Sequence, residues 1–281
     1  MTTVSRTARS PAFHRFLRFW KTPKGITVVA LALLALIALP TQGVSHAAPG
    51  LLLAVAIATT LDVVATRIRR QEWEFPSGAL ITGVIIAFVL RPEEPLGVVA
   101  ATSAIAIASK HILRTRWSNI FNPAALALVA SSFLFSTGQS WWGALPDLGS
   151  FGLPILIVAG VLIADRINKL PLVLSFLGAY YALFTVASLL GQSMFDGEIF
   201  RTPDLQAALF FVLFMADDPP TCPIRYEDQI TFGLIVAFVA FLVFSVWGVV
   251  YYLPAGLIVG NAWESARRQF GSRLKEIIAQ Y

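Results

Sequence analysis

The sequence predicts an all-α integral membrane protein in which ten transmembrane helices form an inverted repeat of five plus five. The first observation is composition: of 281 residues, 57% are hydrophobic and 13% are charged, whereas a soluble domain averages about 25% charged residues. The mean hydropathy is +0.72. The apolar residues form long runs instead of amphipathic stripes, which indicates helices that face lipid or the core of a bundle.

The second observation is the number and order of the apolar runs. Two short sequences half a chain apart resemble each other, Asn122 to Leu126 and Leu253 to Leu257, and each opens the last run in a block of five. An odd number of spans per block makes the two blocks cross the membrane in opposite directions, as in inverted-repeat membrane proteins. The ten runs cover residues 25–40, 50–66, 77–90, 95–113, 122–135, 153–165, 171–190, 204–216, 229–251 and 254–266.

The runs also predict the domain boundaries. The connection between the two blocks is polar and contains Trp141 and Trp142, which suit the membrane interface. We expect a basic cytoplasmic N-terminal segment, a first five-helix repeat, an outer connecting loop, a second five-helix repeat and a basic cytoplasmic tail, at residues 1–24, 25–135, 136–152, 153–266 and 267–281. No small-residue cleavage site clearly follows the first run, so we expect a retained span and not a signal peptide.

Lysine and arginine predict the orientation. With the N-terminus in the cytoplasm, all but two of the 21 Lys and Arg residues fall on the inner side, and the exceptions are Arg91 and Arg201. Cytoplasmic loops carry such an excess of positive charge, so we expect a cytoplasmic (inner) membrane location with both termini inside. The basic residues are dispersed between apolar runs, which favours the lipid bilayer as a partner and argues against nucleic acid.

Four of the runs are too short for a full span: 77–90, 122–135, 204–216 and 254–266. A helix of about 14 residues rises about 21 Å, against a hydrocarbon core of about 30 Å. Backbone beyond their ends then lies at membrane depth, where it is tolerated only when it is buried in protein or lines a wet cavity. These are the third and fifth runs of each block, which favours a working site between them. Extension by polar turns or a thinner bilayer is the alternative.

Residues 214–220 end a short run with two acids and two prolines. Proline disfavours helical geometry at Asp218 and stops the helix, so carbonyls are left free beside the carboxylates of Asp217 and Asp218. Such oxygen ligands suit a small hard cation or a proton relay. Glu93 and Glu94, between two prolines at the outer end of the third run, form a counterpart. We predict an ion pathway with an acidic break on each face; helix ends with solvated acids are the alternative.

Polar residues in the last run of each block extend this set. Asn261 and Glu264 lie within or near the tenth run, where a buried amide or carboxylate needs partners, and we add both to the predicted ion pathway. Asn122 directly precedes Pro123, a pattern typical of a helix N-cap with proline at the first position. Asn122 is also a candidate for binding a cofactor.

The start of the third run is a candidate anion site. Ser77, Gly78 and Thr82 belong to a stretch of small residues that opens this run. The free N–H groups of a helix start suit an anion, such as part of a cofactor. Close packing of helices through small residues is the alternative.

A basic cluster on the inner side is the last candidate for cofactor binding. It consists of Lys110, Arg114 and Arg116, with His111 beside them. Such a cluster suits a phosphate, for instance that of a flavin nucleotide. Contact with lipid headgroups is the alternative.

Three of these segments, in this order, resemble the RnfD/NqrB family: 77–83 (SGALITG), 121–125 (FNPAA) and 214–219 (FMADDP). Members are membrane subunits of the Rnf complex and of the sodium-pumping NADH:quinone reductase. The resemblance covers nearly the whole apolar chain and implies a urea-transporter-like fold, an inverted five-plus-five repeat. It also implies flavin-linked electron transfer coupled to cation movement, with Asp218 at the motif aspartate and Asp217 where the family usually has threonine.

The covalent flavin of that family has no attachment sequence here. Members carry FMN esterified to the threonine of a Ser-Gly-Ala-Thr motif on the outer side, after the fifth span. The Ala-Thr pairs at 58–59, 65–66 and 101–102 lie in other segments and lack the preceding Ser-Gly. We therefore do not expect covalent FMN. A non-covalent flavin, riboflavin or FMN, stays the expectation, because some relatives also hold riboflavin.

The chain requires partners for any redox role. Cys222 is its only cysteine, which excludes an iron–sulfur cluster held by this chain alone, and no Gly-x-Gly-x-x-Gly fingerprint follows a strand. We assign no catalytic or metal-binding residue, and expect partner subunits that carry flavin or iron–sulfur centres. Two alternatives stay open: a channel or transporter for a small solute or ion with the same fold, and a structural assembly subunit.

Overall fold

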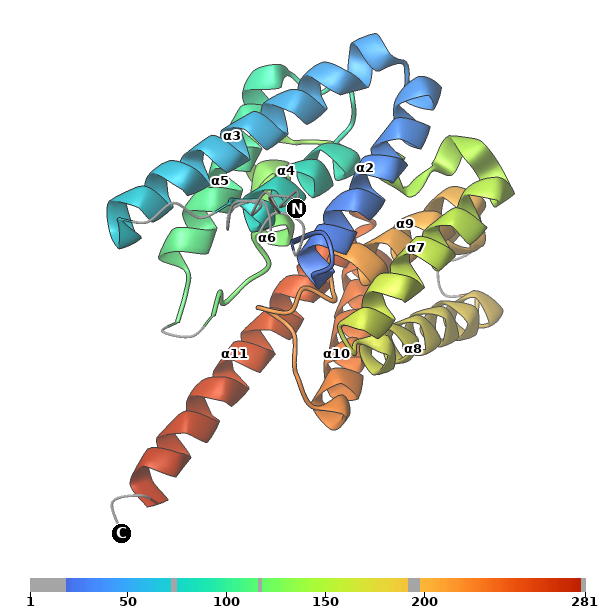
Figure 1. Cartoon of the computed structure of the whole chain (residues 1–281). Coiled ribbons are helices and arrows are strands. Elements are labelled where there is room, and N and C mark those ends of the chain that lie inside the picture. The colour runs from blue at the N-terminus through green and yellow to red at the C-terminus, as the bar shows by residue number, and fades with distance from the viewer. Residues whose placement is uncertain (1–18, 72–74, 116–117, 192–197, 279–281) are drawn as a thin grey trace, which may run out of the picture.

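The computed structural model describes residues 19–71, 75–115, 118–191 and 198–278. This part of the chain contains ten α-helices, three short 3-10 segments and two isolated β-bridges (Figure 1). The helices are α2 (Pro23–Gln42), α3 (Val44–Arg70), α4 (Ser77–Val89), α5 (Leu96–Ile112), α6 (Pro123–Phe135), α7 (Gly152–Arg166), α8 (Leu170–Leu189), α9 (Thr202–Phe214), α10 (Tyr226–Trp247) and α11 (Tyr252–Ile278). The 3-10 segments are η1 (Trp142–Ala144), η2 (Pro146–Phe151) and η3 (Glu198–Phe200).

Each predicted apolar run corresponds to one helix, so the order of elements in the described chain confirms the sequence prediction. Several helix starts have a local cause. Thr22 caps α2 by accepting from the Gly25 N–H, and Asn122 caps α6 by accepting from the Ala125 N–H. Both helices have proline directly after the cap, where its fixed φ suits the first turn and its missing N–H costs nothing.

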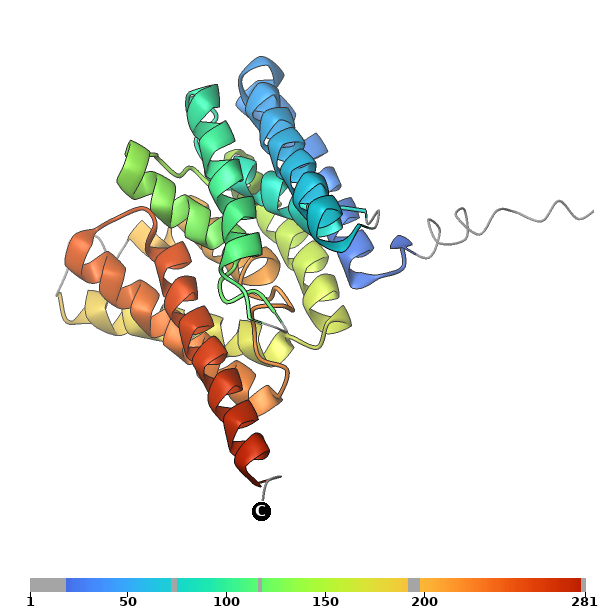
Figure 2. The ribbon, with the colours of Figure 1, turned by 90° about the vertical axis from the view of Figure 1, so that its left-hand side faces the viewer.

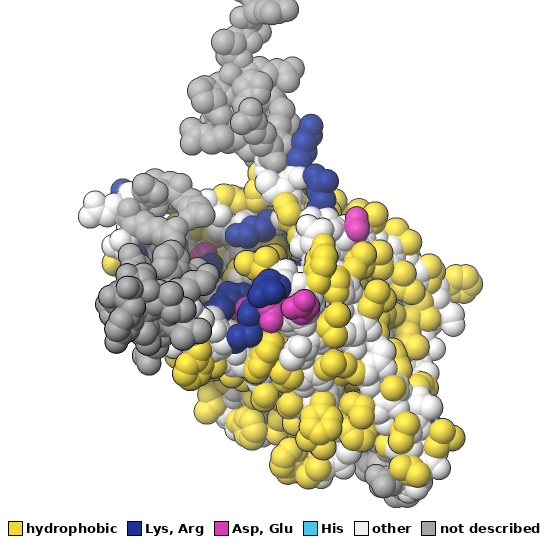
Figure 3. All heavy atoms as spheres, turned by 90° about the horizontal axis from the view of Figure 1, so that it is seen from below, with side chains coloured by type: hydrophobic (Ala, Val, Ile, Leu, Met, Phe, Trp, Pro, Cys, Tyr) yellow, Lys and Arg dark blue, Asp and Glu magenta, His cyan; other side chains and the backbone are white. Residues whose placement is uncertain are grey.

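Five helices are long and apolar enough to cross a membrane: α2, α3, α8, α10 and the stretch Trp142–Arg166, which contains α7. Their outward side chains are apolar and exposed, for example Leu36 (68%), Leu52 (69%) and Leu174 (66%). In Figure 3 hydrophobic side chains surround a central group of charged ones. Such a broad apolar surface requires lipid as its solvent, so the chain is an integral membrane protein.

Three helices that the sequence predicts to be short are short: α4, α6 and α9 have 13 residues each, a rise of about 20 Å. Of the described α-helices, α4 and α9 are also the most enclosed. Nearly all of α4 from Thr82 and nearly all of α9 from Gln206 are buried. The helix α5, with 17 residues, also falls below the length of a full span. The other helices therefore shield α4 and α9 from lipid, whereas the last turn of α6 is exposed at Phe133, Leu134 and Phe135.

The fourth prediction of a short helix is wrong. The helix α11 continues without interruption for 27 residues, through the segment expected to be a separate tail, and projects beyond the other helices (Figures 1 and 2). The apolar run ends near residue 266, but the residues that follow, such as Arg267, Arg268 and Gln269, are good helix formers without proline. Hydropathy predicts where the apolar surface ends, and not where the helix ends.

The outer connecting loop also differs from expectation, because its tryptophans are buried inside the bundle. The indole N–H of Trp142 donates to the Ala87 carbonyl at 2.6 Å, and the ring packs on Phe88 with centroids 4.7 Å apart. The backbone N–H of Ser140 donates to the Val89 carbonyl. The loop thus satisfies carbonyls that α4 leaves free where it stops early, which explains why it folds inward.

The helices pack within each block and across the two blocks. In the first block α3 packs on α4 and α5, and α5 packs on α6; in the second, α8 packs on α10, and α10 on α11. Across the blocks, α2 contacts α7 and α6 contacts α11 (Figures 1 and 2). Some contacts leave no room for a side chain: a Cβ at Gly83 would lie 2.8 Å from the Ala54 carbonyl oxygen. This packing places the ends of short helices from both blocks next to one another.

Candidate functional site

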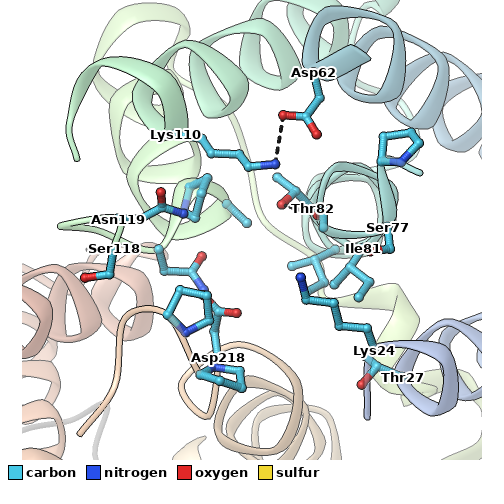
Figure 4. Close-up of a pocket in the computed structure, with 18 of the residues that line it drawn as sticks. Lys24, Thr27, Asp62, Ser77, Ile81, Thr82, Lys110, Ser118, Asn119 and Asp218 are labelled. Atoms are coloured by element: carbon cyan, nitrogen blue, oxygen red, sulfur yellow. Dashed lines mark hydrogen bonds and ion pairs between the residues drawn. The ribbon is translucent and has the colours of Figure 1, made fainter. Parts of the chain in front are cut away.

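A pocket of about 460 Å³ lies between the two blocks (Figure 4). Its walls are the first turns of α2, α4 and α6, the end of α5, a face of α3 and the segment that follows α9. Its apolar side is formed by Ile81, Ile85, Ile163, Leu213 and Phe214. This volume lies within the range of about 300–1,000 Å³ that is usual for small-molecule sites.

The pocket gathers most of the residues predicted as a site, from four separate segments. Within the described part of the chain, the predicted site residues that line the pocket are Ser77, Gly78, Thr82, Lys110, Arg114, Asn122, Asp217 and Asp218. Arg116 lies outside the described residues. Four predicted residues do not line this pocket: Glu93, Glu94, Asn261 and Glu264.

One wall is an ionic cluster centred on Asp62. This carboxylate is buried, and one of its oxygens accepts from Lys110 Nζ and from His111 Nε2, each at 2.8 Å. Lys110 also approaches the first turn of α4, with its Nζ 3.7 Å from the position of a Cβ on Gly78. Asp62 is not among the residues predicted from the sequence, although a lone acid within an apolar run is itself a signal of function in membrane proteins.

Asn122 and Asn261 join the two blocks at the back of the pocket. The Asn122 N–H donates to Asn261 Oδ1 at 2.8 Å, and Asn122 Nδ2 donates to the Met215 carbonyl at 3.0 Å. Asn261 Nδ2 in turn donates to the Thr221 carbonyl at 3.1 Å. Both amides are buried. The predicted N-cap role of Asn122 is confirmed, and the same side chain also holds the free end of α9.

The segment after α9 turns sharply at the two acids. The Asp218 carbonyl accepts from the N–H groups of Thr221 and Cys222 at 3.1 Å, and its carboxylate accepts from the Thr221 hydroxyl at 3.2 Å. Asp217 is 4% exposed, and its Oδ2 is a buried atom with no hydrogen-bond partner among the described residues. A buried carboxylate oxygen without a donor is costly, which points to a donor or cation supplied from outside the described residues.

Arg268 holds together the segments that form the inner rim of the pocket. Its guanidinium donates to the Ser118 hydroxyl and to the carbonyls of Pro220 and Cys222, and it pairs with buried Glu264. Glu264 also accepts from Arg267, whose pKa is raised by this hydrogen bond, so Arg267 stays charged. Both oxygens of Glu264 accept hydrogen bonds from guanidinium groups, an arrangement that fixes the positions of these side chains.

Glu93 and Glu94 lie away from this pocket, after the other end of α4. The Glu94 carboxylate accepts from the Gly138 N–H at 2.8 Å and so holds the start of the outer loop. Their predicted place in an ion pathway stays a prediction. Two pocket residues outside the predicted set are Lys24 and Asn119. Lys24 looked like one of many basic residues near the N-terminus, and only the fold shows that it faces the pocket (Figure 4).

The fold and the site together define a polytopic helical membrane protein. Its short helices end inside the bundle, and their ends enclose a polar pocket. The chain belongs to the NQR2, RnfD, RnfE family, whose model matches residues 10–150 and 148–259. This confirms the resemblance drawn from the three motifs.

One curated relative is similar over part of its length. It belongs to the proton-translocating ferredoxin:NAD(+) oxidoreductase complex of Clostridium ljungdahlii, of which it is one subunit, and 27% of residues are identical over 127 residues. The matched stretch covers 44% of this chain and 38% of that relative. The chain therefore aligns with less than half of the relative's length.

The amide bridge between the blocks predicts a stability effect. Replacing Asn261 with alanine leaves the Asn122 N–H and the Thr221 carbonyl buried without partners, so we expect a loss of about 1–3 kcal/mol in the free energy of unfolding. Thermal unfolding of the detergent-solubilised protein measures it. The exposed amide Gln269, on the same helix, serves as control: Gln269→Ala should change stability by about 0.5 kcal/mol or less. Equal effects of the two substitutions would contradict a structural role for the bridge.

Proposed function

We propose that this chain is the membrane subunit of a flavin-linked electron-transport complex that couples electron transfer to cation movement. The observation that carries the proposal is the pocket itself, in which motif residues of both blocks meet around the unpartnered Oδ2 of buried Asp217. Family membership supports the electron-transport role, and the relative's printed description supports membership of a multi-subunit complex. Partner subunits with flavin or iron–sulfur centres supply the electrons, because the sequence offers a single cysteine.

The residues of the pocket fit a non-covalent flavin. Ile81, Ile85 and Phe214 offer an apolar surface for a planar ring system, and Ser77 and Asn119 offer polar groups for its edges. Asp217 also lines the pocket and offers its carboxylate as an acceptor for an imide N–H or a ribityl hydroxyl. When bound, the flavin supplies one- and two-electron redox chemistry; the surrounding helices exclude water and fix its position.

Asp217 and Asp218 are the proposed inner entrance of the cation pathway. Their carboxylates line the pocket beside the broken end of α9, where oxygen ligands suit a small hard cation. Negative charge that develops in a site of low dielectric attracts a cation strongly, so reduction in this pocket and cation uptake at these carboxylates favour each other. On the other face Glu93 and Glu94 complete the proposed pathway.

We further propose that the blocks 25–135 and 153–266 form an inverted repeat like that of urea transporters, in the cytoplasmic membrane, with both termini inside. The matching order of packing supports the repeat: α3 with α5 and α5 with α6 in the first block, α8 with α10 and α10 with α11 in the second. The distribution of Lys and Arg supports the orientation.

Aromatic side chains packed inside the second block favour the redox role over a channel. The second block's counterpart of the pocket, near the starts of α9 and α11, is packed with aromatic side chains. Tyr180 and Tyr252 share a hydrogen bond between their hydroxyls at 3.0 Å, and Phe184 packs on Tyr180 and on Phe244. A channel for a small solute requires an open path there, and buried rings occupy that position.

A first test is the flavin content of the purified complex. We expect the absorption bands of oxidised flavin after gentle extraction, release of the flavin on denaturation, and no fluorescent protein band on a denaturing gel. Thr27→Trp should lower the flavin content, because an indole at this position fills part of the pocket. Thr231→Trp is the matched control, since Thr231 makes the same hydroxyl-to-carbonyl bond on α10 and does not line the pocket. A colourless preparation would favour the transporter alternative.

The role of the acids is tested by Asp218→Asn. Removal of the negative charge should lower cation uptake by proteoliposomes that contain the complex by about tenfold or more, as loss of about one charged ligand contact implies. Expression should stay unchanged, because asparagine fills the same volume. Glu227→Gln removes an exposed acid of the following helix and is the control. If cation uptake is unchanged in Asp218→Asn, Asp218 serves only to end the helix α9.

The orientation is tested with reporters. Alkaline phosphatase fused after Tyr281 should be inactive, because the enzyme requires export, and a fluorescent protein at the same position should fluoresce. The phosphatase inserted after Gly149, in the outer loop, is the control and should be active. The reverse pattern would overturn the topology and the placement of Asp217 and Asp218 at the inner entrance.

A further inference from the structure

The helix α11 leaves the bundle partway along its length. Its first half is covered, and Leu253 and Asn261 are buried. Its second half extends past the start of α10 and beyond the other helices (Figures 1 and 2), and Phe270 is 72% exposed. Because α10 begins beside the exposed charges of Arg225 and Glu227, this end of α11 projects into water and not into lipid.

An apolar stripe follows α11 from the bundle into this projection. It consists of exposed residues spaced by three or four positions, which are Val259, Ala262, Ala266 and Phe270. This spacing places them on one face of the helix. The sequence of the helix continues the spacing at Leu274 and Ile277. Lipid covers such a stripe inside the bilayer, whereas in water an apolar stripe of this length favours a bound partner.

A groove lies beside the stripe where α11 leaves the bundle. Its volume is about 280 Å³. Residues of α11 and of the segment before α6 line it, namely Ile120, Ala262, Ser265, Ala266, Gln269 and Phe270. Most of this lining is apolar, so the groove suits an apolar side chain that enters from outside. Stripe and groove share three residues, and we refer to them together as the α11 surface.

Basic residues border the α11 surface on both sides. The segment 113–121, beside the groove, contains Arg114 and Arg116 and no acid. Arg114 is exposed and forms no ion pair with a described residue. The end of α11 contains Arg273 and Lys275 with a single acid, Glu276. The surface therefore favours a partner whose apolar side chains are bordered by carboxylates.

Three other occupants fit the α11 surface less well. A second copy of α11 would bring basic residues together, which costs binding free energy. The N-terminal segment 1–18 contains four arginines and no acid, so like charges repel it as well. A helix that binds the bilayer surface lies in the plane of the interface, whereas α11 continues without interruption out of the bundle (Figure 1).

From these observations we infer that the α11 surface binds an acidic amphipathic helix of a partner subunit. The apolar side chains of the partner fill the groove and cover Phe270, and its carboxylates pair with the basic residues on either side. The inference rests on the proposed function for the existence of partner subunits, and it adds the place and the chemistry of one contact. Phe270 does not line the pocket between the blocks, so this contact and the flavin site can be tested separately.

The first test is photo-crosslinking in the full chain. Phe270 is replaced with p-benzoylphenylalanine, the chain is produced in its native host, and the membranes are irradiated. Mass spectrometry should identify one subunit of the complex, crosslinked at a peptide with helical apolar spacing and with Asp or Glu next to the apolar positions. The same replacement at Phe133, which is 71% exposed at the end of α6, is the matched control and should not crosslink that peptide.

The second test measures how tightly that subunit is held in the purified complex. Phe270→Glu places a carboxylate within the apolar stripe, and Arg273→Glu with Lys275→Glu reverses the charge beside it. Each change should weaken binding of the subunit, measured as its retention on dilution, by about tenfold or more. Ile224→Glu changes an apolar residue that is 80% exposed and does not line the groove; this control should retain the subunit.

Several outcomes would overturn the inference. A crosslink from Phe270 to a second copy of this chain, to lipid alone, or to a peptide without acidic residues assigns the surface to a different occupant. If the complex purifies with flavin and partner subunits while the variants at Phe270, Arg273 and Lys275 retain every subunit, the docking surface is overturned and the proposed function stands. If the chain purifies from native membranes without flavin and without any partner subunit, both are overturned.

Discussion

The rest of this structure depends on hydrogen bonds for the backbone groups at the ends of helices that stop inside the bundle. An unpaired N–H or carbonyl costs several kcal/mol in a bilayer. Each short helix has its own solution. The outer loop folds inward and donates to the carbonyls of Ala87 and Val89, at the end of α4. Asn122 and Asn261 serve the start of α6 and the segment after α9. These bonds cross between elements, so they fix the tertiary structure as well as satisfying the ends.

The same constraint explains why the site lies where the two blocks meet. The amide of Asn122 reaches the Met215 carbonyl, and Asn261 reaches the Thr221 carbonyl, so the acidic turn of one block is attached to a helix start of the other. Arg268 adds a third connection through Ser118, Pro220 and Cys222. A pocket bounded by such ends has free polar groups without exposing backbone to lipid. Several of these bonds are made by residues that line the pocket, namely Ser118, Asn122 and Pro220, so they hold the lining itself in place.

The division of charge within the pocket connects structure to the proposed function. The exposed cations Lys24, Arg69 and Arg114 line the pocket together with the carboxylates of Asp217 and Asp218. The two carboxylates favour an incoming cation, and the basic side chains favour an anionic ligand. In the proposed function, one cavity holds a redox ligand and a cation in contact with each other. Coupling through shared electrostatics requires no long-range change of conformation, because each charge alters the binding free energy of the other directly.

The sequence alone predicted the class, the ten helices, three short helices and eight of the residues that line the pocket, because apolar runs, prolines and caps act locally. Asn122 and Asp218 were identified from such local patterns. The sequence did not predict contacts between distant residues. The hydrogen bond from Asn122 to Asn261 joins the two blocks, and the proximity of Lys24, Asp62 and Lys110 depends on how three helices pack. The buried position of Trp142 and the unbroken course of α11 also came only from the tertiary structure. Hydropathy records where apolar surface occurs, whereas contacts between distant residues are set by packing and by the need to pair every buried polar group.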